Sequence, residues 1–253
     1  MATIEKNRAV WTDYDWSQGG EEWSQVWGGS EYLWWSAVYP RILNFLPAAV
    51  GLEIAPGYGR MTEYLQDFCD QLVAVDLAPC CIRACEKRFR HISHITFHVN
   101  DGKSLDMIRD HTIDFAFSFD SLVHADDDAI RGYLWALGRK LSPTGVGFIH
   151  HSNLAACLDP ATGKPPAEVV PHWRSESMSA ERFREFCEEA GLECTGQEII
   201  NWGGSTLLDC FSTFTRPGSP YSRPCRIWEN PGFMAETATL SAIAAHYRRP
   251  SRE

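Results

Sequence analysis

From residue 48 onward, short apolar runs alternate with segments whose apolar residues recur every three to four positions. Short continuous runs are typical of buried strands, and the longer spacing is typical of amphipathic helices. The pattern predicts strands at 48–54, 71–76, 95–100, 113–119, 146–150, 192–201 and 209–215. It predicts helices at 30–46, with an interruption at Pro40, and at 61–69, 79–90, 105–109, 128–141, 179–190 and 235–247. Strands that alternate with helices indicate an α/β fold with a mostly parallel sheet and helices on both faces.

The 253 residues are interpreted as one domain with extensions at both ends. Residues 48–215 form the predicted core, with a Pro-rich irregular insertion at 155–178. Residues 216–253 form a Pro-containing C-terminal extension. Residues 1–47 are rich in tryptophan: six of the ten tryptophans of the chain lie before residue 36. This segment is predicted to be a lid with a helix, and the alternatives of a pocket lining or a dimer contact stay open.

Composition narrows the range of partners. The net charge of −10 argues against nucleic acid, because proteins that bind it usually carry a basic face. No apolar run is long enough for a membrane helix, and the N-terminus lacks the apolar stretch of a signal peptide. We therefore expect a cytoplasmic protein that binds neither nucleic acid nor membranes, and the sequence permits a homo-oligomer. The nine cysteines have no zinc spacing and are interpreted as small core residues.

Glycines and acids follow three consecutive predicted strands. Gly57 and Gly59 lie in the loop after the first strand, Asp76 ends the second, and Asp101 and Gly102 follow the third. Parallel sheets bind ligands at the carboxyl ends of their strands, and an acid at the end of the second strand can hold both hydroxyls of a ribose. Asp101 can accept a hydrogen bond from an adenine amino group, with the Gly102 backbone beside the ring. The spacing predicts an adenosine site.

The first loop distinguishes between two adenosine cofactors. A dinucleotide-binding loop needs a third glycine, and residues 60–62 provide none. Glu53 would repel a pyrophosphate but suits a cationic amine. S-adenosylmethionine has an amine and a sulfonium and no phosphate, so the charge pattern favours it over NAD.

Residues 48–150 resemble the class I S-adenosylmethionine-dependent methyltransferases. The glycine loop of that family is matched by Glu53 through Gly59, although Ala55 replaces the usual first glycine. The resemblance implies a Rossmann-like sheet of seven strands with an antiparallel final hairpin. It also implies S-adenosyl-L-methionine as the cofactor. The predicted cofactor-binding residues are Glu53, Ala55, Gly57, Gly59, Asp76, Leu77, Asp101, Gly102 and Phe119.

The candidate catalytic residues follow the fourth and fifth strands. Asp120 and His124 are four residues apart, so a helical turn there would place them on one face. His150 and His151 are adjacent in a strand and therefore point to opposite faces, so at most one would point into the pocket. Histidine is a suitable general base near neutral pH. We expect the base to be His124, His150 or His151, with Asp120 orienting it.

The same residues are also a candidate metal site. Asp120, His124 and His151 combine carboxylate and imidazole ligands, which suit Mg²⁺, Mn²⁺ or Zn²⁺. A bound Mg²⁺ would acidify a diol or catechol-like acceptor. The spacing alone leaves the metal as an alternative to a metal-free base.

The late segment 197–209 suggests the acceptor. Gln197, Glu198, Asn201 and Asp209 surround Trp202, and polar groups beside an aromatic face suit a sugar. Together with the His-His-Ser-Asn run, this segment is similar to bacterial sugar and polysaccharide O-methyltransferases of the methylmannose polysaccharide 1-O-methyltransferase type. That resemblance implies transfer to a sugar hydroxyl and supports a role for magnesium.

The sequence therefore predicts a methyltransferase that O-methylates a sugar or a sugar-containing metabolite, with a small-molecule or oligosaccharide substrate. Three alternatives remain. One is a methyltransferase for a phenol or an amine, and another is an NAD-dependent dehydrogenase. The third is a non-catalytic protein that binds S-adenosylmethionine as a partner of an enzyme.

Overall fold

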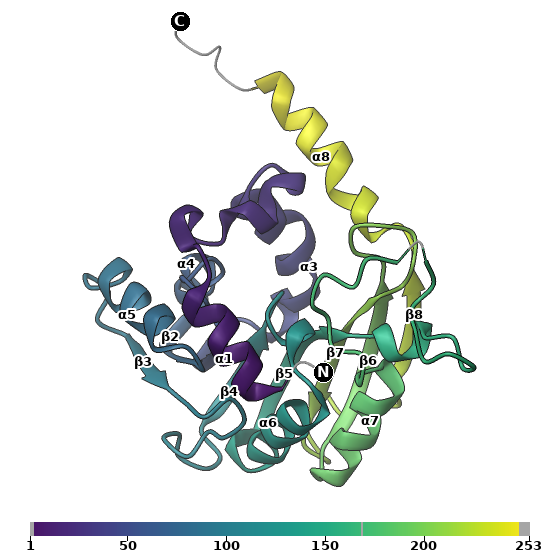
Figure 1. Cartoon of the computed structure of the whole chain (residues 1–253). Helices are drawn as coiled ribbons and strands as arrows, with labels where there is room; N and C mark the ends of the chain where they lie inside the picture. Colours follow the sequence, from purple (N-terminus) through teal and green to yellow (C-terminus); the bar gives the residue numbers. More distant parts are fainter. Residues whose placement is uncertain (1–2, 168, 248–253) are drawn as a thin grey trace, which may run out of the picture.

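The computed structural model describes residues 3–167 and 169–247. These residues form one eight-stranded sheet with the strand order β3-β2-β1-β4-β5-β7-β6-β8 (Figure 1). The strands are β1 (Ala48–Ile54), β2 (Cys69–Asp76), β3 (Ile95–Val99), β4 (Ile113–Ser118), β5 (Leu141–Ser152), β6 (Glu193–Ile200), β7 (Asp209–Thr215) and β8 (Arg226–Asn230). Strands β1 to β5 are parallel, β7 runs antiparallel to both β5 and β6, and β8 is parallel to β6. The predicted α/β architecture is confirmed, with one strand more than the seven expected.

Helices precede, connect and follow the strands. They are α1 (Ile4–Asp13), α2 (Ser30–Leu33), α3 (Tyr39–Ile42), α4 (Thr62–Leu65), α5 (Pro79–Arg88), α6 (Asp127–Lys140), α7 (Ala180–Glu189) and α8 (Phe233–Tyr247). Shorter turns are η1 (Trp16–Gln18), η2 (Glu21–Trp27), η3 (Trp34–Val38), η4 (Leu43–Phe45), η5 (Gln66–Phe68), η6 (Leu122–His124) and η7 (Leu154–Cys157). In Figure 1, α8 projects from the body of the protein, and α1 crosses in front of the sheet.

The sheet divides the core into two layers because successive strand side chains point to opposite faces. On one face, Ala116 of β4 packs with α6 and α7 through residues such as Leu134 and Phe183. On the other face, Phe115 and Phe117 pack with η3, α4 and α5. The alternation fixes which side chain at the end of each strand faces which layer.

Three local predictions are wrong. Residues 105–109 form turns and no helix. Residues 142–145, which lie between the predicted helix at 128–141 and the predicted strand at 146–150, belong to β5, where Thr215 Oγ1 donates a 2.6 Å hydrogen bond to the Gly145 carbonyl. The eighth strand, β8, lies in the extension at 216–253, where only a helix was predicted. For β5 and β8, pairing with a distant strand outweighs the local sequence preference.

The predicted helix at 30–46 is broken into short pieces at its proline. A π-helical turn, η3, precedes α3, and Pro40 lies in the first turn of α3. Proline has no N–H to donate to the carbonyl four residues earlier, and its ring crowds that carbonyl. The wider turn accommodates both effects and leads the chain into β1.

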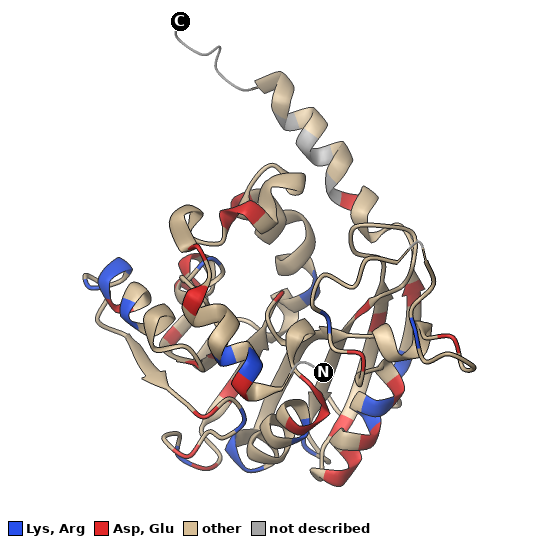
Figure 2. Ribbon diagram, in the orientation of Figure 1, with Lys and Arg blue, Asp and Glu red and all other residues tan. Residues whose placement is uncertain are grey.

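Charges are mixed over the surface. Figure 2 shows Lys and Arg interspersed with Asp and Glu along α7. Within the described residues, no helix is long and apolar enough to cross a membrane.

Candidate active site

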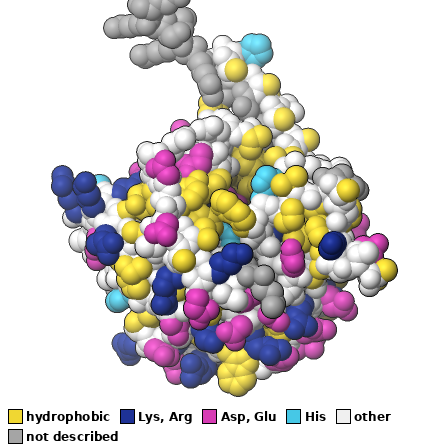
Figure 3. All heavy atoms as spheres, in the orientation of Figure 1, with side chains coloured by type: hydrophobic (Ala, Val, Ile, Leu, Met, Phe, Trp, Pro, Cys, Tyr) yellow, Lys and Arg dark blue, Asp and Glu magenta, His cyan; other side chains and the backbone are white. Residues whose placement is uncertain are grey.

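A cavity of about 1050 Å³ lies at the carboxyl ends of the central strands. Its walls come from the loop after β1, the ends of β2 and β4, the segment 170–176 and the N-terminal segment. Sites for cofactors and small molecules commonly have volumes of roughly 300–1,000 Å³, so this cavity can hold a nucleoside and a small acceptor together. Figure 3 shows hydrophobic side chains gathered on this face, between the N-terminal segment and the base of α8.

The N-terminal segment forms one wall of this cavity. Trp11, Tyr14, Trp16 and Trp23 line it and pack against one another, with ring centroids 5.1–6.0 Å apart. The ring of Trp16 also stacks on Tyr58 in the loop after β1, at 4.5 Å. The sequence left a lid, a pocket lining and a dimer contact open for this segment. The structure shows that the segment lines the cavity.

The loop after β1 requires unusual backbone angles. Ala55, Gly57 and Gly59 all have positive φ, at 58°, 58° and 83°. A Cβ at Gly59 would lie 2.5 Å from Cε2 of Phe89, so this glycine allows the loop to pack closely on the residue that ends α5. Ala55 and Gly57 line the cavity, whereas Gly59 is not among the lining residues. Gly59 therefore contributes to the conformation of the loop and does not itself face the cavity.

Asp76 ends β2 on the cavity wall, as predicted. It accepts hydrogen bonds from the backbone N–H groups of Gly57, at 3.1 Å, and Ala78, at 2.8 Å. Burial raises the pKa of its carboxyl to about 6. These bonds orient the carboxylate toward the loop after β1, and Leu77 lines the cavity beside it.

Glu53 ends β1 as a buried carboxyl on the same wall. Its Oε2 accepts a 2.6 Å hydrogen bond from the Thr62 hydroxyl. Burial, reinforced by the nearby charge of Asp76, raises the pKa of Glu53 to about 7. A cationic group in the cavity would favour the ionised form, so Glu53 is suited to bind an amine.

Asp101 is not among the residues that line the cavity, and its contact with adenine stays a prediction. Its Oδ1 accepts hydrogen bonds from the backbone N–H groups of Lys103, at 3.0 Å, and Ser104, at 2.7 Å. The carboxylate thus caps its own turn on the exposed surface. Gly102 does line the cavity, and the side chain of Ile4 in α1 packs on it.

Two of the predicted site residues directly follow β4. Phe119 and Asp120 both line the cavity. Asp120 has a positive φ of 57° and forms an ion pair with Arg60, with 2.7 Å between Oδ2 and the guanidinium nitrogen. Arg60 also donates a 2.6 Å hydrogen bond to the Ser24 hydroxyl. Sequence reasoning missed Arg60, although it directly follows the second loop glycine.

His124 lies on the same cavity wall at the end of η6. Its Nδ1 is 3.1 Å from the carbonyl oxygen of Trp173. Among the described residues, no hydrogen-bond partner is found for its Nε2. The ring packs against Trp11 at 5.1 Å, and burial lowers the pKa of the imidazole below its usual value. His124 is therefore a neutral imidazole with one nitrogen available to the cavity.

His150 and His151 point to opposite faces of β5, as predicted, but neither lines the cavity. His150 accepts the Asp120 N–H at Nδ1, at 3.1 Å, and its Nε2 lies 3.2 Å from Asp209. His151 stacks on Phe183 on the far side of the sheet, and burial lowers its pKa to about 4. Both rings are fully buried. The structure therefore contradicts their assignment as candidate bases.

The predicted metal ligands are not brought together. Asp120 is paired with Arg60, and His151 is fully buried against Phe183 and does not line the cavity as His124 does. Across residues 3–167 and 169–247, no group of three or more His, Cys, Asp or Glu side chains is arranged to hold a metal ion. The described residues do not fit the predicted magnesium site.

The polar residues predicted to bind a sugar have other partners. Glu198 binds Arg41, and Asp209 binds Arg174, through two hydrogen bonds each. Gln197 donates to the Ala180 carbonyl. Of the residues predicted to bind a sugar, only Trp202 lines the cavity, together with the neighbouring Gly203.

Comparison with known proteins agrees with this geometry. Residues 52–145 match the family described as a methyltransferase domain. Phosphoethanolamine N-methyltransferase 1 of Triticum aestivum is 26% identical over 196 residues, which are 75% of this chain and 37% of the relative. The chain thus spans little more than a third of that relative's length.

Solved structures share the fold at low sequence identity. An S-adenosylmethionine-dependent methyltransferase from Clostridium acetobutylicum has a TM-score of 0.56 and 15% identity, with 84% of this chain and 96% of that chain covered. The N-methyltransferase NodS from Bradyrhizobium japonicum has a TM-score of 0.52 and 18% identity, with 71% and 94% covered. Together, the comparisons show a methyltransferase domain at residues 52–145 and a fold that is shared with S-adenosylmethionine-dependent methyltransferases.

Proposed function

We propose that the enzyme transfers a methyl group from S-adenosylmethionine to the nitrogen of a small amine. The observation that carries this proposal is that His124, with its available Nε2, lies on one cavity wall with aromatic side chains and with Asp120, whose Oδ2 binds Arg60. A carboxylate and the faces of Trp11 and Trp23 all attract an ammonium group.

The opposite end of the cavity suits the cofactor. The buried carboxyl of Glu53 can hold the amine of the methionine part, and Asp76 can hold the ribose hydroxyls. When bound, the cofactor supplies an activated methyl group on a sulfonium. The positive φ values of Ala55 and Gly57 let the loop backbone approach it closely.

On the acceptor side, His124 would do the proton chemistry. An ammonium has no lone pair, so it must first lose a proton, and Nε2 of His124 is the available base. The freed lone pair then forms the bond to the methyl carbon while the carbon–sulfur bond breaks and its electrons remain on sulfur. Oδ1 of Asp120, the oxygen that does not bind Arg60, would contact the cationic substrate before the transfer and the protonated product after it.

A sugar hydroxyl is the second candidate acceptor. Trp202 and Gly203 on the cavity wall support it, because an aromatic face can stack on a sugar ring. The amine is favoured for two reasons. First, the other residues predicted to bind a sugar form hydrogen bonds with other residues of the protein. Second, the relative from Triticum aestivum is named for N-methylation.

A methylation assay distinguishes the two acceptors. The purified protein is incubated with S-adenosylmethionine and either ethanolamine, phosphoethanolamine or a set of monosaccharides and oligosaccharides, and products are identified by mass spectrometry. We expect N-methylated products and activity that persists with a chelator, since the described residues contain no metal cluster. Methylated sugars without methylated amines would overturn the proposal.

The affinity for the cofactor is expected to depend on pH through Glu53. Its pKa of about 7 exceeds the usual 4.5, so in the unliganded protein a proton competes with the cationic amine. Affinity should fall up to about tenfold per pH unit below pH 7 and level off above it. The sign for stability is opposite: the folded state holds this proton more tightly, so the unfolding free energy of the unliganded protein falls as pH rises from about 4.5 to about 7.

Calorimetric titration between about pH 5.5 and 8.5 measures the affinity. Glu53→Gln removes the group and should leave only the weaker dependence that comes from Asp76, whose pKa is about 6. A pH profile in the variant identical to that of the native protein would show that Glu53 does not bind the amine.

A further inference from the structure

The tautomer of His124 is set by a backbone carbonyl. The Trp173 oxygen can only accept a hydrogen bond, so the Nδ1 that lies 3.1 Å from it must carry the proton. In the neutral ring this leaves the lone pair on Nε2, which is the form that a general base requires. Whatever holds the Trp173 carbonyl in place therefore also determines whether His124 can accept a proton.

The backbone at Trp173 is strained and needs to be held. His172 and Trp173 have consecutive positive φ values of 45° and 61°. Non-glycine residues seldom adopt this strained region, so such a conformation persists only where its surroundings enforce it. The Trp173 side chain is 65% exposed, with its ring centroid 6.3 Å from that of Trp11, so the main constraint must come from a buried neighbour.

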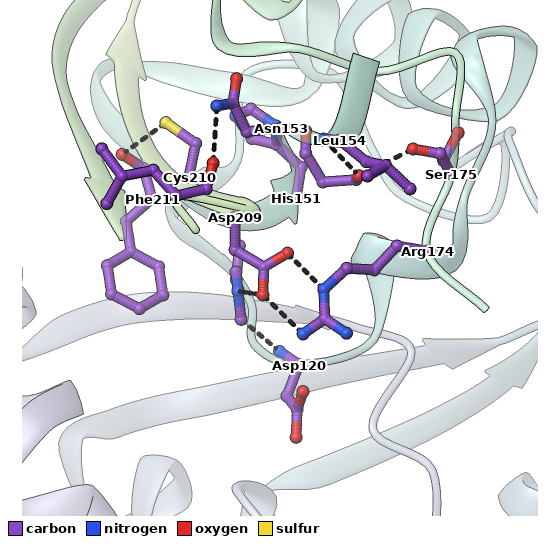
Figure 4. A network of polar contacts seen from close by, with 12 residues as sticks. Asp120, His151, Asn153, Leu154, Arg174, Ser175, Asp209, Cys210 and Phe211 are labelled. Atoms are coloured by element: carbon purple, nitrogen blue, oxygen red, sulfur yellow. Dashed lines mark hydrogen bonds and ion pairs between the residues drawn. The ribbon is translucent and has the colours of Figure 1, made fainter. Parts of the chain in front are cut away.

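The neighbouring residue supplies it. Arg174 is buried and forms a two-pronged ion pair with Asp209 at the start of β7, with distances of 2.6 and 2.7 Å (Figure 4). The following Ser175 N–H donates to the Val123 carbonyl, which precedes His124 in the chain. The segment is thus attached on one side to the sheet and on the other to the turn that carries the base.

Asp209 is also linked, through His150, to Asp120, the other residue proposed to bind the acceptor. It lies 3.2 Å from Nε2 of His150, whose Nδ1 accepts the Asp120 N–H, so one carboxylate is linked to the backbone at Asp120 and to the segment behind His124. Burial alone would raise the pKa of Asp209, but Arg174 and His150 outweigh it and hold that pKa well below its usual range. The carboxylate stays ionised, so the ion pair persists at every pH at which the enzyme would work.

We infer that Arg174, paired with Asp209, is a positioning residue that keeps His124 in its Nδ1–H tautomer. The inference rests on the proposed role of His124 as the base. Arg174 acts on His124 indirectly, because it holds the Trp173 carbonyl in place. This role would explain why a buried ion pair lies beneath the exposed Trp173.

The experiment uses ¹⁵N-histidine-labelled protein and long-range proton–nitrogen NMR, with the His124 signals assigned from the His124→Asn variant. Arg174→Lys keeps the positive charge opposite Asp209 but cannot form the two-pronged contact. We expect the native ring to be protonated at Nδ1 and the variant to show a mixture of tautomers. We also expect kcat to fall at least about tenfold, with little change in KM for the cofactor.

Arg131→Lys is the matched control, because its ion pair with Glu189 is exposed and neither residue lines the cavity. It should leave the tautomer and kcat unchanged. If Arg174→Lys leaves the His124 tautomer unchanged, the inference is overturned, whether or not activity falls. If instead His124→Asn is fully active, the proposed base is wrong, while the tautomer shift still reports separately on Arg174.

Discussion

Replacing His124 with asparagine is expected to lower kcat by roughly 10²–10⁴-fold, the range that a general base contributes. The asparagine amide can still donate to the Trp173 carbonyl, so the turn that carries residue 124 should keep its conformation. What the variant loses is the basic nitrogen at the position of Nε2. The measurement is steady-state kinetics with the amine identified in the methylation assay, together with calorimetric binding of S-adenosylmethionine.

Cofactor affinity should change little in this variant, since the residues proposed to bind the cofactor lie at the ends of β1 and β2. The pH profile gives a second check. The lowered pKa of His124 predicts that native activity remains high below the usual histidine range and falls only in more acidic buffer. An unchanged kcat in His124→Asn would contradict the proposed mechanism.

Replacing Asp76 with asparagine is expected to weaken binding of S-adenosylmethionine about a hundredfold or more. A carboxylate that accepts hydrogen bonds from two ribose hydroxyls would lose two charge-assisted bonds, each worth roughly 1.5–3 kcal/mol. Asparagine keeps an oxygen to accept one of the backbone N–H groups that now bind Asp76. The effect should therefore appear in the dissociation constant, measured by calorimetry, more than in the unfolding temperature.

Asp101→Asn is the matched control for this second substitution. Both acids were predicted from their strand ends, but only Asp76 lies on the cavity wall. The Asp101 variant should change the dissociation constant less than about threefold. A loss as large as that of the Asp76 variant would mean that Asp101 reaches the cofactor and that the cavity described here is incomplete at its adenosine end.

The difference between these two acids illustrates what sequence patterns can predict. Asp76 could be placed because a buried strand that ends in an acid, after a glycine loop, is a local signal with a fixed geometric meaning. Asp101 carried a similar signal, but its carboxylate binds its own turn. Short-range hydrogen bonds of aspartate compete with ligand binding, and the sequence does not show which of them prevails.

The fold was predictable where hydrophobic periodicity is strong. The two histidines of β5 were expected on opposite faces, and that alternation is confirmed, because it follows from strand geometry alone. Their exclusion from the cavity was not predictable, since it depends on Asp209 and Phe183 from distant parts of the chain. For the same reason β8 was missed: its five residues become a strand only by pairing with β6.

The position of α1 has a consequence for the kinetics of the enzyme. This helix has no buried residues, yet it covers the cavity through Ile4, Val10 and Trp11, and its Asn7 donates a 2.8 Å hydrogen bond to the His124 carbonyl. A helix with no buried residues can separate from the rest of the protein at little cost. We therefore expect α1 to move when the cofactor enters and leaves, so that release of the spent cofactor would compete with chemistry for control of the rate.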